Sequence, residues 1–325
     1  MFQRFYSLAL NTFIETVRQP IYGVILLATA AMLILNVSLA AFTLDDDDSL
    51  LLDLGLSTLM LSGLFLSAFS AAGVLSREIE NKTVLTVISK PISRPIFILG
   101  KFAGLTAALA VAFYISMLVF ILAQRHGVLQ NTSDPWDVPV LVFGLGSVLL
   151  SLFGAAYCNY FYGRDFPTTL VAFVLPLLSG GVLAVAKFDE HWDVIPFASN
   201  FVGGQVIIAV YLVWLMAIVT AAVALAASTR FGQLMTLVIC TAVLGIGLVS
   251  DSAFGRHEAT SILAAGAYRA FPNMGPFWVV DGLRAGTEQT AVPWQYVGLT
   301  SAYAALLVVG TLGIAIAAFQ RREVG

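Results

Sequence analysis

Eight long apolar runs constrain the fold of this chain more than any other feature of its sequence. Each run has about 20 residues and few charges, which is the length that an α-helix needs to cross the hydrocarbon core of a bilayer. The sequence therefore predicts an all-α, polytopic integral membrane protein with about eight transmembrane helices. The predicted spans cover residues 20–44, 54–76, 101–123, 139–161, 167–187, 205–228, 233–250 and 295–319.

The fifth and seventh runs are the weakest of these spans. Pro176 and the pair Gly180-Gly181 interrupt the fifth run, and the seventh run is short. Six spans would remain if both runs were re-entrant or interfacial. The sequence alone leaves six and eight spans open.

The composition leaves little material for a soluble domain. Of the 325 residues, 59% are hydrophobic and 11% are charged, whereas a soluble domain carries about 25% charged residues. We therefore expect a single transmembrane domain over residues 1–325. Cys158 and Cys240 both fall within predicted spans, so we expect buried free cysteines and no disulfide framework.

Residues 1–19 have an amphipathic pattern of their own before the first span. The residues that share one helical face are Phe5, Leu8, Ala9, Thr12, Phe13 and Thr16. The apolar run after Pro20 continues for a full span, so a cleavable signal peptide is not expected. We interpret this segment as an interfacial elbow helix; a frayed terminus is the alternative.

Residues 77–101, REIENKTVLTVISKPISRPIFILGK, are the one long charged segment in the first half of the chain. Val84, Leu85 and Ile88 recur at helical spacing, and Pro91 then ends the pattern. This arrangement predicts a short amphipathic helix at the membrane surface. An ordinary loop helix without a partner is the alternative.

The two ends of the same segment add further signals. Glu78, Glu80 and Lys82 place charges of both signs in the first turn of the predicted helix, which a helix that binds only lipid does not need. Gly100 and Gly104 open the next span with small-xxx-small spacing. That spacing favours close packing of the third span against another helix.

Three stretches of the chain resemble one family of membrane proteins. Residues 78–83, 89–94 and 99–101 resemble, without a gap, the cytoplasmic loop of the type-2 exporter permeases of ATP-binding-cassette (ABC) transporters. Residues 227–230, Ala-Ser-Thr-Arg, resemble the basic turn between two late helices of these permeases. Residues 318–323 are similar to their terminal Phe-x-Arg-Arg-Glu. Much of the remaining chain matches the family in hydropathy alone.

The resemblance implies that residues 77–100 form a coupling loop that docks on a separate cytoplasmic ATPase subunit. ATP and Mg²⁺ would then bind to that partner, and a second permease chain, identical or different, would complete the pathway. No catalytic, cofactor or metal site is expected in this chain, and its other partner would be membrane lipid and not nucleic acid. The residues assigned to the ATPase contact are Arg77, Glu78, Glu80, Lys82, Thr83, Lys90, Pro91, Ser93, Arg94 and Lys101.

The distribution of charge predicts the orientation. With eight spans and a cytoplasmic N-terminus, 11 of the 16 Lys and Arg residues lie on the cytoplasmic side and the other 5 lie outside. Of the 19 acidic residues, 5 lie inside and 14 outside. This arrangement satisfies the positive-inside rule. We therefore predict a bacterial-type plasma (inner) membrane protein with both termini in the cytoplasm.

Two predicted outer segments allow more than one interpretation. Residues 45–48 are four aspartates, followed by Asp53, and such a run could hold a divalent cation. The run lacks the spacing and the glycine of a calcium loop, so a solvated topology signal is the favoured interpretation. The large outer segment 251–294 is expected to fold as short surface helices that form a lid or a partner contact.

The sequence carries no motif for chemistry within this chain. It has no G-x-x-x-x-G-K-[ST] phosphate loop. His126, His191 and His257 lie in three separate predicted outer loops, so the histidines do not form a motif. The interiors of the predicted spans hold no Asp, Glu, Lys, Arg or His, which counts against an ion-coupled carrier.

Mildly polar residues such as Asn36, Ser62 and Ser67 lie in the spans beside aromatic ones. They suit an amphipathic or lipid-like cargo, or they serve only as contacts between helices. The predicted function is the membrane permease subunit of an ATP-driven exporter. A membrane scaffold or sensor subunit without transport is the main alternative, and an ion-coupled carrier is the third.

Overall fold

The computed structural model describes residues 2–41, 47–80, 93–128, 136–199, 201, 203–257, 265–266, 268, 271–280, 283 and 291–320, with the backbone alone for 76–80. Within these residues the chain is helical and has no named strand, only an isolated bridge between Phe188 and Val194. Eight of the described helices are long and apolar enough to cross a membrane. The all-α, polytopic membrane fold is therefore confirmed.

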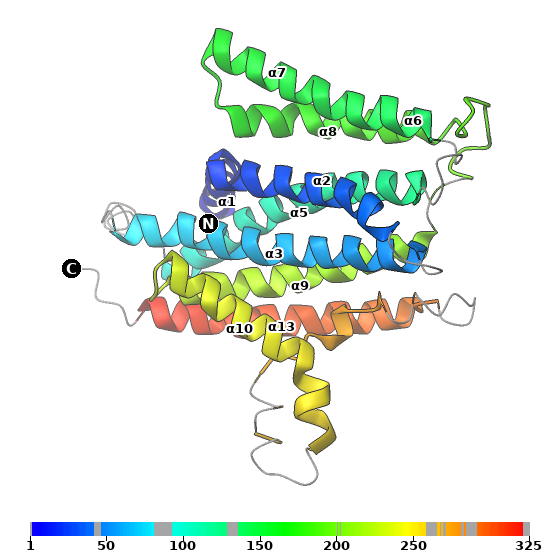
Figure 1. Ribbon diagram of the computed structural model, residues 1–325. Coiled ribbons are helices and arrows are strands. Elements are labelled where there is room, and N and C mark those ends of the chain that lie inside the picture. Colours follow the sequence, from blue (N-terminus) through cyan, green and yellow to red (C-terminus); the bar gives the residue numbers. More distant parts are fainter. Residues whose placement is uncertain are drawn as a thin grey trace. The chain divides into compact units, whose positions relative to one another are not determined.

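Figure 1 labels most of the helices along the chain. The described elements are α-helices, the π-helical segment η1 and two short 3-10 turns, Gly255–His257 and Gly275–Phe277. In chain order the helices are α1 Phe2–Arg18, α2 Pro20–Ala40, α3 Asp47–Glu80, α5 Arg94–His126, α6 Val138–Val140, η1 Leu141–Leu145, α7 Gly146–Tyr162, α8 Phe166–Val185, α9 Gly204–Ser228, α10 Gln233–Ala253 and α13 Trp294–Gln320.

The fifth and seventh predicted spans are continuous helices, α8 and α10, of 20 and 21 residues. α8 passes through Pro176 without a break. Gly181, which we expected to interrupt the span, instead permits close packing on α7. A Cβ atom at this position would lie 2.7 Å from the Ser147 hydroxyl oxygen and 2.8 Å from the Phe143 carbonyl oxygen. Both helices are therefore continuous, and each is long and apolar enough to cross a membrane.

The described helices form two compact units. The first unit comprises Met1–Thr16, Gly63–Ala110 and Tyr211–Gly325, and it includes α10 and α13. The second unit comprises Val17–Ser62 and Val111–Val210, and it includes α2, α7 and α8. The unit boundaries fall inside α1, α3, α5 and α9.

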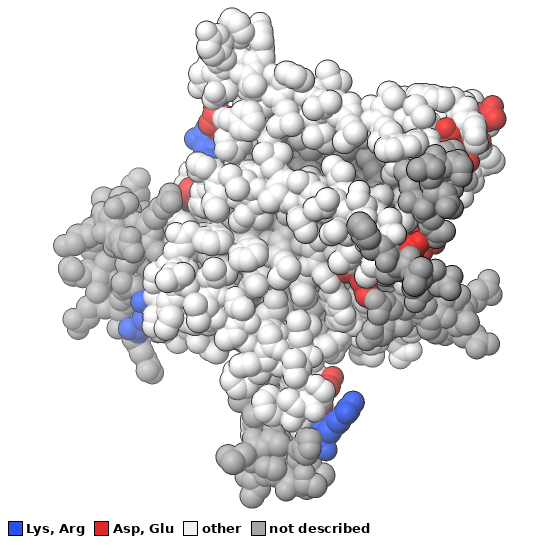
Figure 2. All heavy atoms as spheres, in the orientation of Figure 1, with Lys and Arg blue, Asp and Glu red and all other residues white. Residues whose placement is uncertain are grey.

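α9 forms much of the core of the first unit, where Val219, Ala221 and Ala222 are fully buried. The hydroxyl of Ser67 in α3 donates to the Ala217 carbonyl oxygen of α9 at 3.0 Å. α13 is more exposed, and it presents Leu306, Val309 and Ile314 at 73%, 69% and 66% exposure. On the face shown in Figure 2, most of the described surface carries no charged side chain, as expected for helices that face lipid.

Polar contacts join α2 and α3 in the second unit. The Asn36 amide donates to the Thr58 hydroxyl at 3.0 Å, and the Thr29 hydroxyl donates to the Ser62 hydroxyl at 2.8 Å. These bonds, like that of Ser67, satisfy polar groups between helices. The structure thus gives the mildly polar span residues Asn36, Ser62 and Ser67 a role in helix packing.

A buried arginine closes one end of the second unit. Arg125 lies beyond the predicted span 101–123, but α5 extends to His126 and Arg125 lies in its last turn, 2% exposed. Its Nε atom is 3.0 Å from Oδ2 of Asp137, and its terminal nitrogens donate to the carbonyl oxygens of Val185 and Phe188. Arg125 therefore ties the ends of α5 and α8 to the segment before α6.

The aspartate run is described only in part. Residues 45 and 46 lie outside the described residues, whereas Asp47 and Asp48 open α3. Acidic residues in the first turn of a helix are favourable, because the N-terminus carries partial positive charge. Asp47 is buried and Asp48 is exposed, so at Asp47 the expectation of a solvated signal is wrong.

Candidate functional site

The residues assigned to the ATPase contact fall into three groups. Arg77, Glu78 and Glu80 belong to α3, which continues through Glu80 where a separate helix was expected to begin. Good helix formers and the absence of Gly or Pro explain this extension. Ser93 precedes α5 and is exposed, and Arg94 and Lys101 belong to α5. The group outside the described residues consists of Lys82, Thr83, Lys90 and Pro91, together with the predicted helix residues Val84, Leu85 and Ile88.

Arg94, the first residue of α5, contacts the C-terminal end of α13. One of its terminal nitrogens donates to the carbonyl oxygen of Gln320 at 2.5 Å and lies 3.5 Å from that of Phe319. The last carbonyls of a helix have no intrahelical partner and carry partial negative charge. Arg94 therefore caps α13 with a charge of the stabilising sign.

A second arginine caps the same helix end. Arg230, in the turn after α9, donates from Nη2 to the Ala318 carbonyl oxygen at 3.0 Å. This turn is the basic turn singled out by the sequence. Its exposed arginine thus contacts the terminal segment that resembles the same family.

An aromatic stack lies beneath the first of these caps. Phe97 and Phe319 are both buried, with ring centroids 5.5 Å apart and planes inclined at 17°. The Lys101 ammonium lies 5.8 Å from the centre of the Phe97 ring. Arg94, Phe97 and Lys101 are spaced i, i+3 and i+7, so the geometry of the helix places them on one face of α5.

Lys101 also joins α5 to α1. Its Nζ atom is 3.4 Å from Oε2 of Glu15, and its side chain has no exposed surface. A buried ammonium is costly unless it is paired, which explains the acidic residue on α1. Lys101 is thus an internal residue of the first unit and has no surface that a partner could contact directly. A role of Lys101 in coupling would therefore depend on its ion pair with α1.

Two glycines allow α1 to lie close to α5. A Cβ atom at Gly104 would lie 2.3 Å from the Ala9 carbonyl oxygen, and one at Gly100 would lie 2.7 Å from the Leu8 side chain. The predicted close packing at this small-xxx-small pattern is confirmed. The predicted helix over residues 1–19 is confirmed as well, and Thr12 and Thr16 are buried on its predicted face.

We refer to this group as the α5 base cluster, which consists of Glu15, Arg94, Phe97, Lys101, Arg230 and Phe319. It unites the end of the charged loop, the 227–230 turn and the end of α13, although Arg94 and Gln320 are separated by 226 positions in sequence. Sequence reasoning missed Glu15 and Phe97. The face shared by Arg94, Phe97 and Lys101 was the signal that could have revealed Phe97.

No family model matches the chain, and no curated protein matches it either. The interpretation of the α5 base cluster therefore depends on its geometry and on the resemblance of the segments that meet there.

Proposed function

We propose that the chain is the membrane permease subunit of an ATP-driven exporter that works with a separate cytoplasmic ATPase and a second permease chain. The α5 base cluster is the observation that carries this proposal. It fastens the end of the charged loop to α13 through Arg94 and Phe97, and to α1 through Lys101. A subunit driven by a partner needs such a connection between its docking segment and its membrane helices.

In this mechanism the partner ATPase closes on ATP and displaces residues 77–93. Arg94 directly follows that segment and begins α5, a continuous helix of 33 residues. A displacement at the start of α5 would reach α13 through the arginine cap and α1 through the buried ion pair. Arg94 and Lys101 are then positioning residues, whereas Glu78 and Lys82 belong to the docking surface.

The cluster also supports the proposed topology. Because Arg94 bonds to Gln320, and Arg230 bonds to Ala318, the start of α5, the 227–230 turn and the end of α13 lie at the same end of the first unit. The excess of basic residues assigns this end to the cytoplasm. We place the protein in a bacterial-type inner membrane with both termini cytoplasmic, and α1 serves as the elbow helix.

Charge reversal in the docking segment tests the proposal. In proteoliposomes with the partner ATPase, Glu78→Lys and Lys82→Glu should each weaken ATPase binding by about 10-fold or more, as expected for lost charge-assisted contacts of about 1–3 kcal/mol. Arg164→Glu is the matched control, because Arg164 is an exposed basic residue in the turn between α7 and α8. Normal binding and stimulated hydrolysis by both reversed variants would refute the proposal. Binding without any transport would favour the scaffold or sensor alternative.

A further inference from the structure

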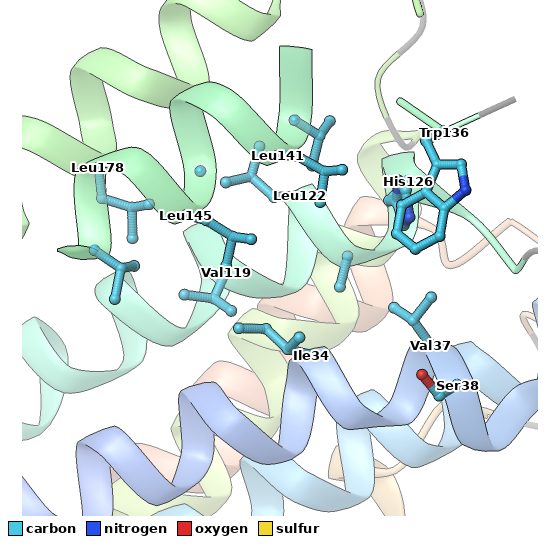
Figure 3. A pocket seen from close by; sticks show the side chains of 14 residues that line it. Ile34, Val37, Ser38, Val119, Leu122, His126, Trp136, Leu141, Leu145 and Leu178 are labelled. Carbon is cyan, nitrogen blue, oxygen red and sulfur yellow. The ribbon is translucent and has the colours of Figure 1, made fainter. Parts of the chain in front are cut away.

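A cavity of about 280 Å³ lies within the second unit, between α2, α5, α8 and the segment from η1 to α7. Its walls are mainly aliphatic. Figure 3 shows His126 and Trp136 together at one end of the cavity, whereas Val119, Leu145 and Leu178 lie farther from that end. The cavity is therefore apolar along most of its length and polar at one end.

His126 and the partly exposed Trp136 lie next to a buried ion pair at the polar end. The His126 and Trp136 rings are 5.9 Å apart between centroids. Each ring is adjacent in sequence to one partner of the buried ion pair between Arg125 and Asp137. The guanidinium nitrogens of Arg125 already bond to Asp137 and to the carbonyl oxygens of Val185 and Phe188. Nδ1 of His126 is buried and has no hydrogen-bond partner among the described residues, whereas the neighbouring charges are engaged with each other.

The dimensions of the cavity suit one alkyl chain. Its lining on α5 extends from Val119 to His126, a rise of about 10 Å for seven residues. This distance is less than half the thickness of a hydrocarbon core of about 30 Å, and the lining reaches His126, the last residue of α5, so the cavity fits within one leaflet. Its volume is just below the range of about 300–1,000 Å³ that is typical of small-molecule pockets, too small for both chains of a phospholipid.

One wall is built from an unusual backbone. η1 is a π-helical segment, and it contributes Leu141, Gly144 and Leu145 to the lining. Such segments are rare in proteins overall, and those that occur often lie at functional sites. Gly144 keeps this wall close to α5, because a Cβ atom there would lie 3.1 Å from the Leu122 side chain.

We propose that this cavity binds a single-chain amphiphile with an uncharged head, of the monoacylglycerol type. The alkyl chain would contact the aliphatic walls, which water solvates poorly. The hydroxyl or ester groups of the head would bond to His126 and Trp136. Binding does not depend on the ATPase; only a further role of this ligand as cargo rests on the proposed function.

The test uses the purified full-length protein in nanodiscs and a monoacylglycerol with a photoreactive diazirine in its chain. We expect cross-links in η1 and α8. The yield of these cross-links should fall at least 10-fold in Val37→Phe, because the larger side chain narrows the cavity. Val24→Phe is the control, since Val24 lies on the same helix, is 60% exposed and does not line the cavity. A thermal unfolding curve for each variant verifies folding.

Competition with unlabelled lipids separates the alternatives. An excess of monoacylglycerol should abolish the cross-links, and a fatty acid or a two-chain phospholipid should compete at least 10-fold less well. Better competition by the fatty acid would contradict the proposal that the ligand has an uncharged head. Better competition by the phospholipid would contradict the proposal that the ligand has a single chain. Cross-links spread evenly over the lipid-facing helices and unchanged in Val37→Phe would overturn the site itself.

Discussion

The ammonium of Lys101 lies 3.4 Å from the carboxylate of Glu15, and the lysine side chain is fully buried whereas 35% of the glutamate side chain is exposed. The two partners are thus unequal in their access to water. Loss of Glu15 would leave a buried charge without this partner, whereas loss of Lys101 would leave a carboxylate that water can reach.

This asymmetry predicts different effects for the two single substitutions. Glu15→Gln should reduce the free energy of unfolding toward the lower end of the about 3–5 kcal/mol seen when a buried pair is broken. Lys101→Met should reduce it less, because the thioether chain still packs against Phe97. Denaturation of the purified protein in detergent measures both values. Equal losses would contradict the described burial of Lys101.

Arg94 should affect the folded protein as well as the partner. Residue 94 lies outside the predicted spans, but its contacts with the carbonyl oxygens of Phe319 and Gln320 connect it to the folded membrane domain. Arg94→Ala should lower the free energy of unfolding by about 1–2 kcal/mol. Arg94→Glu should lower it more, because it places a negative charge at a helix C-terminus. Hydrogen exchange at residues 315–320 should rise in both variants. Arg164→Ala is the control, and an equal rise in that control would dismiss the cap.

Arg125 and Asp137 form the more deeply buried ion pair, at 2% and 8% exposure. Arg125→Met alone should destabilise the protein by about 3–5 kcal/mol, because it leaves a buried carboxylate unpaired. The double variant with Asp137→Leu should recover part of this loss in a double-mutant cycle. Additive losses in the thermal unfolding of the two single variants would show that the pair does not act as a unit.

Thiol labelling tests the orientation. In a chain without Cys158 and Cys240, Asn81→Cys and Gln320→Cys should both resist an impermeant reagent in intact cells, because both positions are predicted to be cytoplasmic and Arg94, which begins α5 after the loop, contacts Gln320. Glu190→Cys, in the exposed turn after α8, should react. Asp47 is a poor position because it is buried. Opposite behaviour of residues 81 and 320 would contradict the predicted orientation.

The eight spans were predictable because each needs only a run of apolar residues, and Gly100 and Gly104 revealed a helix contact through their spacing. The helix ends were less predictable: α3 and α5 extend past the apolar runs into charged residues such as Glu80 and Arg125. The partners of Arg94 and Lys101 were not predictable, since hydropathy does not specify which helices meet. Gly181 misled us because a glycine that breaks a helix and one that lets a neighbour approach look alike in sequence.

Photo-cross-linking from residue 81 in the native membrane tests whether the chain couples to an ATPase through this loop. A photoreactive amino acid at Asn81 should cross-link to a cytoplasmic protein that carries G-x-x-x-x-G-K-[ST] and hydrolyses ATP. The same probe at Glu190 should not cross-link to it, and Glu78→Lys should reduce the product at least 10-fold. If residue 81 yields no ATPase, or if Glu190 yields the same ATPase equally well, the chain is not coupled to an ATPase through this loop.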